Sequence, residues 1–192
     1  MTYVNLDREL ALARQAHQHP ELADDVWRSL ATTIHSEIAA LDESTINRLR
    51  QTIMLPPERY VEELTAFQAW TEIAQSHKDN PVVVRARVMT ELYVAFVWLR
   101  DSVVKPTAAT LAPGSALRCV EQFLSNGQRR HLRNAIAHGR WCYLPDFTGL
   151  EYWAEPSRGQ PHERYEIANS ELGAWQVLSR GTAIAVLLSL TT

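Results

Sequence analysis

The sequence predicts a mostly α-helical bundle of about six to seven helices, with a small β-hairpin inserted before the C-terminal helix. Three observations predict this class. The 192-residue chain contains only 7 glycines, roughly half the usual usage. Prolines and capping residues divide most of it into segments whose apolar residues lie three and four positions apart. A short aromatic segment near the C-terminus instead combines strand-forming residues with a glycine-containing turn.

Composition and charge exclude several classes of protein. Hydrophobic residues make up 46 % of the chain, enough to bury a core. The formal net charge of −3 excludes a strongly basic protein that coats nucleic acid, although it allows a local basic site. Two cysteines, Cys119 and Cys142, cannot form a disulfide framework or a four-cysteine zinc site. The N-terminus is too charged for a secretory signal and the apolar tail over 183–190 too short for a membrane span, so we expect a cytoplasmic protein with no membrane partner.

Four helices are predicted in the first part of the chain. Their bounds, set by apolar spacing, capping residues and prolines, are about 6–17, 21–41, 44–54 and 57–76. We expect a single domain over residues 1–192, in which an N-terminal helical extension over 1–55 precedes a bundle core over 57–190.

The segment after Pro81 is apolar on almost all sides. Its β-branched start would suit a strand, but residues 82–99 run for about eighteen positions without a break, which favours a buried central helix. Pro106 and Pro113 then predict a loop.

The last third of the chain combines helices with the β element. The predicted elements are helices over about 115–125 and 128–139, a hairpin that starts at residue 141 and turns at 146–149, and a third short strand over 164–167. The β-hairpin region therefore spans about 141–167. A final helix, capped by Asn169 or Ser170, continues to about residue 190.

One stretch concentrates the residues that could carry chemistry. From Gln122 to Pro145 the chain has no aspartate or glutamate. The same stretch contains six arginine and histidine side chains, Arg129, Arg130, His131, Arg133, His138 and Arg140. In a chain of net charge −3, this is a local concentration of positive charge on one helix and its end.

Two of these side chains flank the outward face of the predicted helix. At about 100° per residue, Arg133 and His138 lie roughly 140° apart, opposite an apolar stripe that faces the core. Ala137 leaves a gap between them, and Asn134, one turn before His138, can orient the imidazole. We expect a homodimer packed through this helix to complete the concavity and to bring two arginines and two histidines into one cleft.

The residue types suit RNA cleavage without a metal or any other cofactor. A guanidinium fork matches a phosphodiester, and an imidazole can accept or donate a proton near neutral pH. In such a reaction a base deprotonates the ribose 2′-OH, arginines stabilise the charged phosphorane and an acid protonates the leaving 5′-oxygen. DNA lacks this nucleophile, so the substrate would be RNA. The sequence contains no P-loop, no His-Glu-x-x-His segment and no paired acidic motif, so no metal ligands are predicted.

The segment Arg133-Asn134-x-x-x-His138 resembles the signature of the HEPN superfamily, an arginine, usually a polar residue, a short spacer and a histidine. The resemblance covers roughly residues 57–190. It implies a helical bundle that dimerises around the motif helix, and a metal-independent endoribonuclease, often a toxin or defence effector that an antitoxin or other regulator controls. Arg133 and His138 correspond to the catalytic pair and Asn134 to the polar position beside the arginine. Because fold does not determine activity, a non-catalytic HEPN-like module that binds nucleotide, RNA or a partner protein is the second hypothesis.

The neighbouring basic residues have two interpretations each. Arg130, near the middle of the outward face, is the better candidate for a second phosphate contact. Arg129 and Arg140 suit either an RNA contact or a solvated face. His138-Gly139 is also what an ordinary helix end would contain, with glycine at the terminating position.

Three residues outside this cluster are accessory candidates. Glu91 lies four residues after Arg87, a spacing that suits a structural ion pair. If their helix passes behind the motif, Glu91 or Tyr93 would instead orient Arg133. Trp141 falls on the outward face if the motif helix continues to it. It either offers a stacking surface for a base or packs the hairpin on the bundle.

Overall fold

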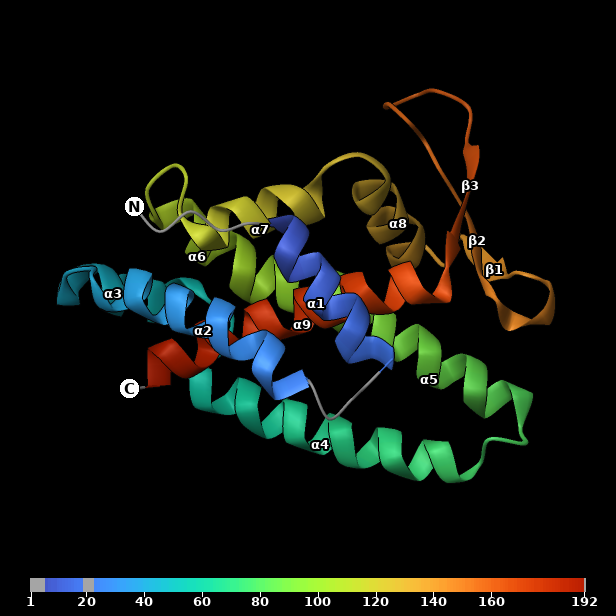
Figure 1. The fold of residues 1–192 in the computed structure, drawn as a ribbon, viewed down its shortest axis with the longest axis horizontal. Helices are drawn as coiled ribbons and strands as arrows, with labels where there is room; N and C mark the ends of the chain where they lie inside the picture. The colour runs from blue at the N-terminus through green and yellow to red at the C-terminus, as the bar shows by residue number, and fades with distance from the viewer. Residues whose placement is uncertain (1–5, 19–22, 192) are drawn as a thin grey trace.

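Helices make up most of the structure, and a small sheet precedes the last of them (Figure 1). The computed structural model describes residues 6–18 and 23–191. The helices are α1 (Leu6–Gln18), α2 (Ala23–Ala39), α3 (Glu43–Thr52), α4 (Pro57–Ser76), α5 (Pro81–Tyr93), α6 (Lys105–Thr110), α7 (Ala116–Ser125), α8 (Gly127–Ala137) and α9 (Asn169–Thr191). The strands are β1 (Trp141–Tyr143), β2 (Gly149–Ala154) and β3 (Glu163–Ala168). The predicted fold class, a mostly α-helical bundle with a β-hairpin before the C-terminal helix, is confirmed.

α9 is the helix around which the others are arranged (Figure 1). α1, α2 and α4 all contact it. Its buried residues occur along its whole length and include Leu172, Trp175, Leu178, Ala183, Val186 and Leu190. A helix that is apolar or small on every side can be covered from every side, which is why α9 occupies the centre. Neither α9 nor any other described helix is long and apolar enough to cross a membrane.

The segment predicted as the buried central helix, residues 82–99, begins at the surface instead. Val82, Met89 and Tyr93 of α5 are 74 %, 46 % and 46 % exposed. The apolar residues of α5 face more sides than its neighbours cover, and apolar character alone does not determine which helix becomes central. The prediction of burial is therefore wrong for most of α5, where Leu92 is buried, and holds for later residues such as Leu99.

Two π-helical turns, Val94–Trp98 and Arg100–Val104, connect α5 to α6 without a break. α9 fastens this segment, because the Ser179 hydroxyl donates to the carbonyl of Ala95 over 2.6 Å in the core. Pro106, predicted to mark a loop, lies inside this continuous helical stretch, directly after the second π-helical turn. The helix predicted to end near residue 99 thus continues to Thr110.

α1 and α2 belong to the core and do not form an extension beside it. Leu10, Ile34 and Ile38 are buried in the same hydrophobic cluster as Leu178 of α9. The predicted division at residue 55 therefore does not separate an outer part from a core. The predicted start of the second helix, residue 21, lies outside the described residues.

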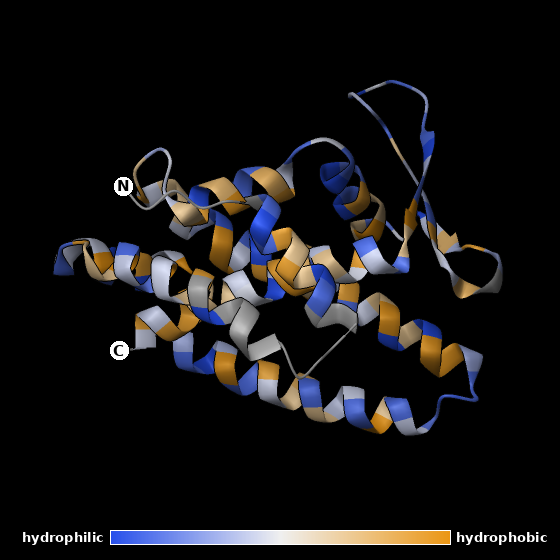
Figure 2. Cartoon of the chain, viewed as in Figure 1, coloured by the Kyte–Doolittle hydropathy of each residue, from blue (hydrophilic) through white to orange (hydrophobic). Residues whose placement is uncertain are grey.

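The sheet packs one face against the bundle. β1 and β2 are antiparallel with Trp141 opposite Tyr152, and β2 and β3 are antiparallel with Leu150 opposite Ile167. All four of these side chains are buried, as the two-residue alternation of a strand requires for one inner face. The connection between β2 and β3 is hydrophilic and extends away from the bundle (Figure 2).

Gly149→Ala is expected to destabilise the protein by about 2–3 kcal/mol. A Cβ at this position would lie 2.1 Å from the carbonyl oxygen of Ile167 in β3, and backbone atoms cannot move aside cheaply. Chemical denaturation measures the effect. Ser157→Ala, at the exposed tip between β2 and β3, is the control. Equal stability of the two variants would contradict the close approach of β2 and β3.

Glu171→Gln is expected to reduce stability at neutral pH and to have no effect in acid. Hydrogen bonds from Arg14 of α1, at 2.8 and 3.1 Å, lower the pKa of Glu171 below its ordinary value of 4.5. The contribution is therefore fully present above about pH 4.5 and lost as the pH falls through the lowered pKa. Since both side chains are partly exposed, the loss at pH 7 is at most about 1 kcal/mol.

Denaturation of wild type and Glu171→Gln at pH 7 and at about pH 3 checks this expectation. Glu62→Gln, which removes an exposed ion pair within α4, is the control. A difference between wild type and Glu171→Gln that persists in acid would show that the carboxylate contributes through something other than its charge.

Candidate functional site

α8 carries the Arg-Asn-x-x-x-His motif, and its apolar face fixes the direction of the other side chains. Leu132, Ala135 and Ile136 are buried, as the predicted stripe requires. The helix contacts β2 on one side and α5 on another. The remaining side chains of α8 must therefore point away from these buried contacts.

α8 ends at Ala137, two residues earlier than predicted. The backbone N–H of His138 donates to the carbonyl of Asn134 over 3.1 Å, and Gly139 then adopts a φ of +66°. This left-handed conformation favours glycine and terminates the helix. The helix-end interpretation of His138-Gly139 is thus correct for the backbone. It does not account for the exposed imidazole of His138.

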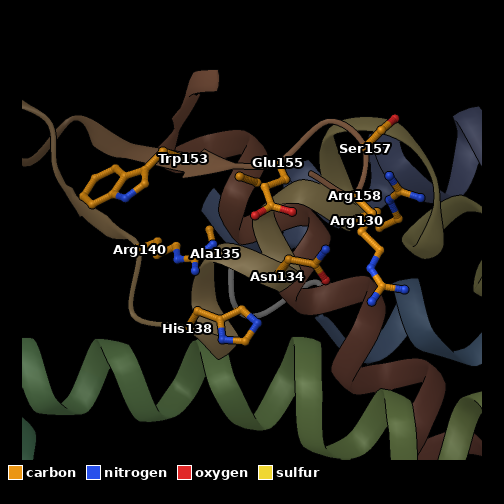
Figure 3. A pocket seen from close by; sticks show the side chains of 10 residues that line it. Arg130, Asn134, Ala135, His138, Arg140, Trp153, Glu155, Ser157 and Arg158 are labelled. Carbon is orange, nitrogen blue, oxygen red and sulfur yellow. The ribbon is translucent and has the colours of Figure 1, made fainter. Parts of the chain in front are cut away.

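A pocket of about 310 Å³ lies between the C-terminal part of α8 and the β2–β3 hairpin (Figure 3). Residues of α8 and the segment after it that line it are Arg130, Asn134, Ala135, His138 and Arg140. The hairpin contributes Trp153, Ala154, Glu155, Ser157 and Arg158. The structure therefore brings together four of the predicted site residues, Arg130, Asn134, His138 and Arg140, and adds a wall that the motif did not predict.

Two arginines attach the hairpin connection to the helix side of the pocket. Arg130 donates from Nη2 to the carbonyl of Pro156 over 2.9 Å. Arg140 contacts His162 through Nη1, and His162 lies 3.9 Å from the carboxylate of Glu155. A guanidinium has five N–H donors, so each arginine keeps further donors for a ligand.

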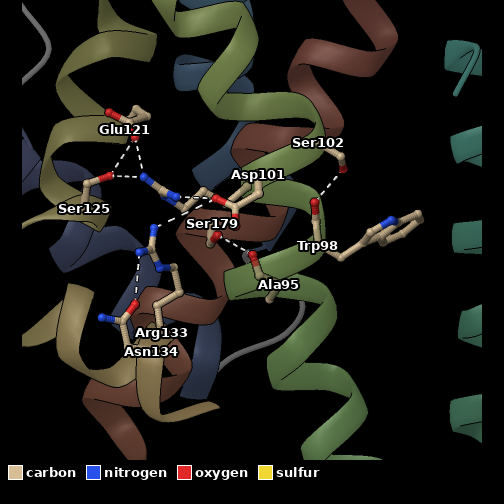
Figure 4. Close-up of polar contacts among 10 residues, drawn as sticks. Ala95, Trp98, Asp101, Ser102, Glu121, Ser125, Arg133, Asn134 and Ser179 are labelled. Carbon is tan, nitrogen blue, oxygen red and sulfur yellow. Dashed lines mark hydrogen bonds and ion pairs between the residues drawn. The ribbon is translucent and has the colours of Figure 1, made fainter. Parts of the chain in front are cut away.

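Arg133 lies outside the lining of this pocket, on the side of α8 that faces the π-helical segment (Figure 4). Its Nη2 donates to Oδ1 of Asn134 over 3.0 Å, and its Nη1 lies 3.9 Å from Oδ1 of Asp101. Burial lowers the pKa of Arg133, with a second contribution from the positive charge of Arg100. Asn134 therefore links the two sides, because it binds Arg133 and also lines the pocket beside His138.

Asp101 is shared between two arginines (Figure 4). Besides approaching Arg133, it pairs with Arg100, whose side chain is only 5 % exposed. Arg100 also donates to Glu121 over 2.6 Å and to Ser125, both on α7. Of this cluster of Arg100, Asp101, Glu121 and Ser125, Asp101 is the member that approaches Arg133.

Glu91 and Tyr93 do not have the role that the sequence suggested for them, because Asp101 is the acidic partner of Arg133. Glu91 lies 4.0 Å from Arg87, in the structural ion pair that was the alternative, and burial raises its pKa. Tyr93 lies at a surface pocket between α5 and α8. Asp101 was missed because the helix was predicted to end near residue 99, and no pattern in the sequence indicates the π-helical turns that continue it.

Trp141 cannot stack on a base, because it is 2 % exposed. Its ring packs edge-on against Tyr143, and the guanidinium carbon of Arg85 lies 5.1 Å from its centroid. Helical spacing placed Trp141 on the outward face only on the assumption that the helix continues to it. In the structure, Trp141 packs the sheet on the bundle, which was the alternative use.

Arg129 contributes to packing and does not line the pocket. Its Nε donates to the carbonyl of Phe123, and its guanidinium carbon lies 3.6 Å from the Phe123 ring centroid. Burial lowers its pKa. Arg129 thus joins α7 to α8, and neither of its predicted roles, RNA contact or solvated face, describes this environment.

Arg100→Ala is expected to destabilise the protein by about 3 kcal/mol, because it leaves the half-buried carboxylate of Glu121 with the Ser125 hydroxyl but without its cationic partner. Chemical denaturation measures the loss. Arg59→Ala, which removes exposed ion pairs on α4, is the control and should change stability little. If both variants lost equally little stability, the cluster around Arg100 would not hold α7 against the π-helical segment.

Comparisons with protein-family models, curated proteins and solved structures find no match to this chain. Among the residues that the structure describes, no group of three or more histidine, cysteine, aspartate or glutamate side chains could hold a metal ion. The motif on α8 and the geometry around it are therefore the basis on which a function can be assigned.

Proposed function

We propose that this protein is a metal-independent endoribonuclease whose active centre contains Arg133 and His138 of two protomers. One observation carries the proposal. The exposed imidazole of His138 stands in a pocket with the guanidinium groups of Arg130, Arg140 and Arg158, one turn from the Arg133–Asn134 pair. A titratable proton carrier surrounded by phosphate-binding groups suits metal-independent RNA cleavage.

Two protomers are part of the proposal because Arg133 and His138 face different sides of α8 in one chain. A surface pocket of about 380 Å³ between α5 and α8, lined by Met89, Tyr93 and Ala137 among others, supports a homodimer. Apolar surface at this position, next to the motif, is what a second copy would cover. A two-fold axis there would bring each Arg133 towards the other protomer's His138.

The reaction follows from these groups. Neutral His138 of one protomer accepts the proton of the ribose 2′-OH, and the 2′-oxygen forms a bond to phosphorus. Arg133 stabilises the negative charge of the phosphorane. The bond from phosphorus to the 5′-oxygen then breaks, and protonated His138 of the other protomer donates a proton to that oxygen. The products end in a 2′,3′-cyclic phosphate and a 5′-hydroxyl.

The proposed setting follows the resemblance of the motif to HEPN proteins. We propose a cytoplasmic toxin- or defence-type nuclease whose activity an antitoxin or other regulator holds in check. With a net charge of −3, long-range attraction to RNA is weak, which favours a structured RNA target recognised at this site.

A non-catalytic module that binds nucleotide, RNA or a protein is the alternative, and one observation favours it. Arg133 is already held by Asn134 and Asp101, so its guanidinium is less available to a transition state than that of an unpaired arginine. Such a module would bind RNA in a manner weakened by salt and by Arg133→Ala, and leave the RNA intact.

His138→Ala is expected to reduce the rate of RNA cleavage in EDTA by about 10²–10⁴-fold, the usual contribution of a general acid or base. Gel analysis of a total RNA digest measures the rate, and the ends of the fragments identify the cyclic phosphate. Because His138 is exposed, the variant should unfold at the same denaturant concentration as wild type.

His77→Ala is the matched control, since His77 is exposed at the end of α4, in another surface pocket. It should cleave like wild type. Cleavage by His138→Ala at the wild-type rate would remove His138 from the active centre. Saturable RNA binding without cleavage by wild type would establish the non-catalytic alternative.

A further inference from the structure

We infer that the pocket between α8 and the β2–β3 hairpin is a subsite for one nucleotide of the RNA, next to the phosphate that is cleaved. This inference deepens the proposed function and rests on it. The Arg-Asn-x-x-x-His motif accounts for His138 and Asn134 at one wall of the pocket. It does not account for the opposite wall, which consists of Trp153, Glu155 and Arg158.

The volume of the pocket suits such a ligand. At about 310 Å³, it lies at the lower end of the range for small-molecule sites, roughly 300–1,000 Å³. A single nucleotide falls in this range, whereas a helical RNA segment does not fit. RNA is commonly recognised through single unstacked nucleotides of this kind.

The charge of the pocket suits the phosphate. Guanidinium groups of Arg130, Arg140 and Arg158 line it, against the single carboxylate of Glu155 among the lining residues. Figure 3 shows Arg130 and Arg158 towards one side of the pocket in this view, and Arg140 towards the other. Guanidinium groups that line the same pocket can bind one phosphate, so we place the nucleotide's phosphate on the side of the pocket lined by Arg130 and Arg158.

The remaining polar groups suit the edge of a base. Figure 3 shows the carboxylate of Glu155, on the hairpin wall, directed towards Asn134 and His138 on the helix wall. A carboxylate accepts hydrogen bonds from the amino groups of bases, and guanine offers adjacent ring and amino N–H groups to its two oxygens. Uracil has no amino group. Glu155 therefore favours guanine over uracil in this subsite.

The hairpin is held in place for this role. The hydrogen bond from Arg130 to Pro156 and the contact between Arg140 and His162 attach both ends of the β2–β3 connection to α8 and the segment after it. A wall fixed at both ends is preorganised, and preorganisation lowers the entropic cost of binding.

Calorimetry of wild-type protein with guanosine 3′-monophosphate, uridine 3′-monophosphate and inorganic phosphate tests the inference. The guanosine nucleotide should bind at least fivefold tighter than the other two. Arg158→Ala should weaken both nucleotides about tenfold, through the lost phosphate contact. Glu155→Gln should bring the two nucleotides within about twofold of each other, because the amide presents one acceptor oxygen in place of two.

Arg59→Ala, which removes an exposed arginine of α4, is the control for lost positive charge, and it should bind the nucleotides like wild type. Equal affinity for phosphate and both nucleotides, or unchanged binding in Arg158→Ala, would overturn the subsite. Binding by wild type without RNA cleavage would overturn the proposed nuclease and leave the subsite standing. Cleavage of RNA without nucleotide binding would overturn the subsite and leave the proposed nuclease standing.

Discussion

The packing of the inner face of α8 is the constraint on which the rest of the site depends. Leu132, Ala135 and Ile136 are buried in the bundle, so the helix cannot rotate without exposing them. This fixes Arg133 towards the π-helical segment and His138 towards the hairpin. The chemical groups gain their positions from apolar residues that take no part in any chemistry.

The sequence predicted the parts of this arrangement that depend on local pattern. Apolar periodicity gave the helices of the bundle, and the glycine-containing turn gave the first hairpin of the sheet. The inner stripe of α8 was correct because Leu132, Ala135 and Ile136 repeat at helical spacing. For the same reason, helical spacing alone places Arg130, Asn134 and His138 together on the outward face.

What the sequence could not predict depends on how distant segments meet. The segment over 82–99 and the terminal helix are both apolar on most sides, so composition alone did not show that α9 takes the centre. Trp141 was misplaced because helical spacing was extended beyond Gly139, where the positive φ ends the helix. The hairpin wall of the pocket, with Glu155 and Arg158, depends on the way the sheet packs beside α8, and no local pattern encodes that packing.

Because of the two π-helical turns, the geometry of the site depends on the number of residues in this segment. A single-residue deletion within 94–104 would convert one π turn into an α turn and keep the backbone bonded, yet it would rotate everything before it by about 100° relative to everything after it. Either α5 would no longer pack against the bundle, or the carboxylate of Asp101 would no longer face Arg133 of α8. A point substitution in this segment, Arg100→Ala included, removes the contacts of one side chain but keeps the helical register, whereas a deletion changes the register of every residue on one side of it.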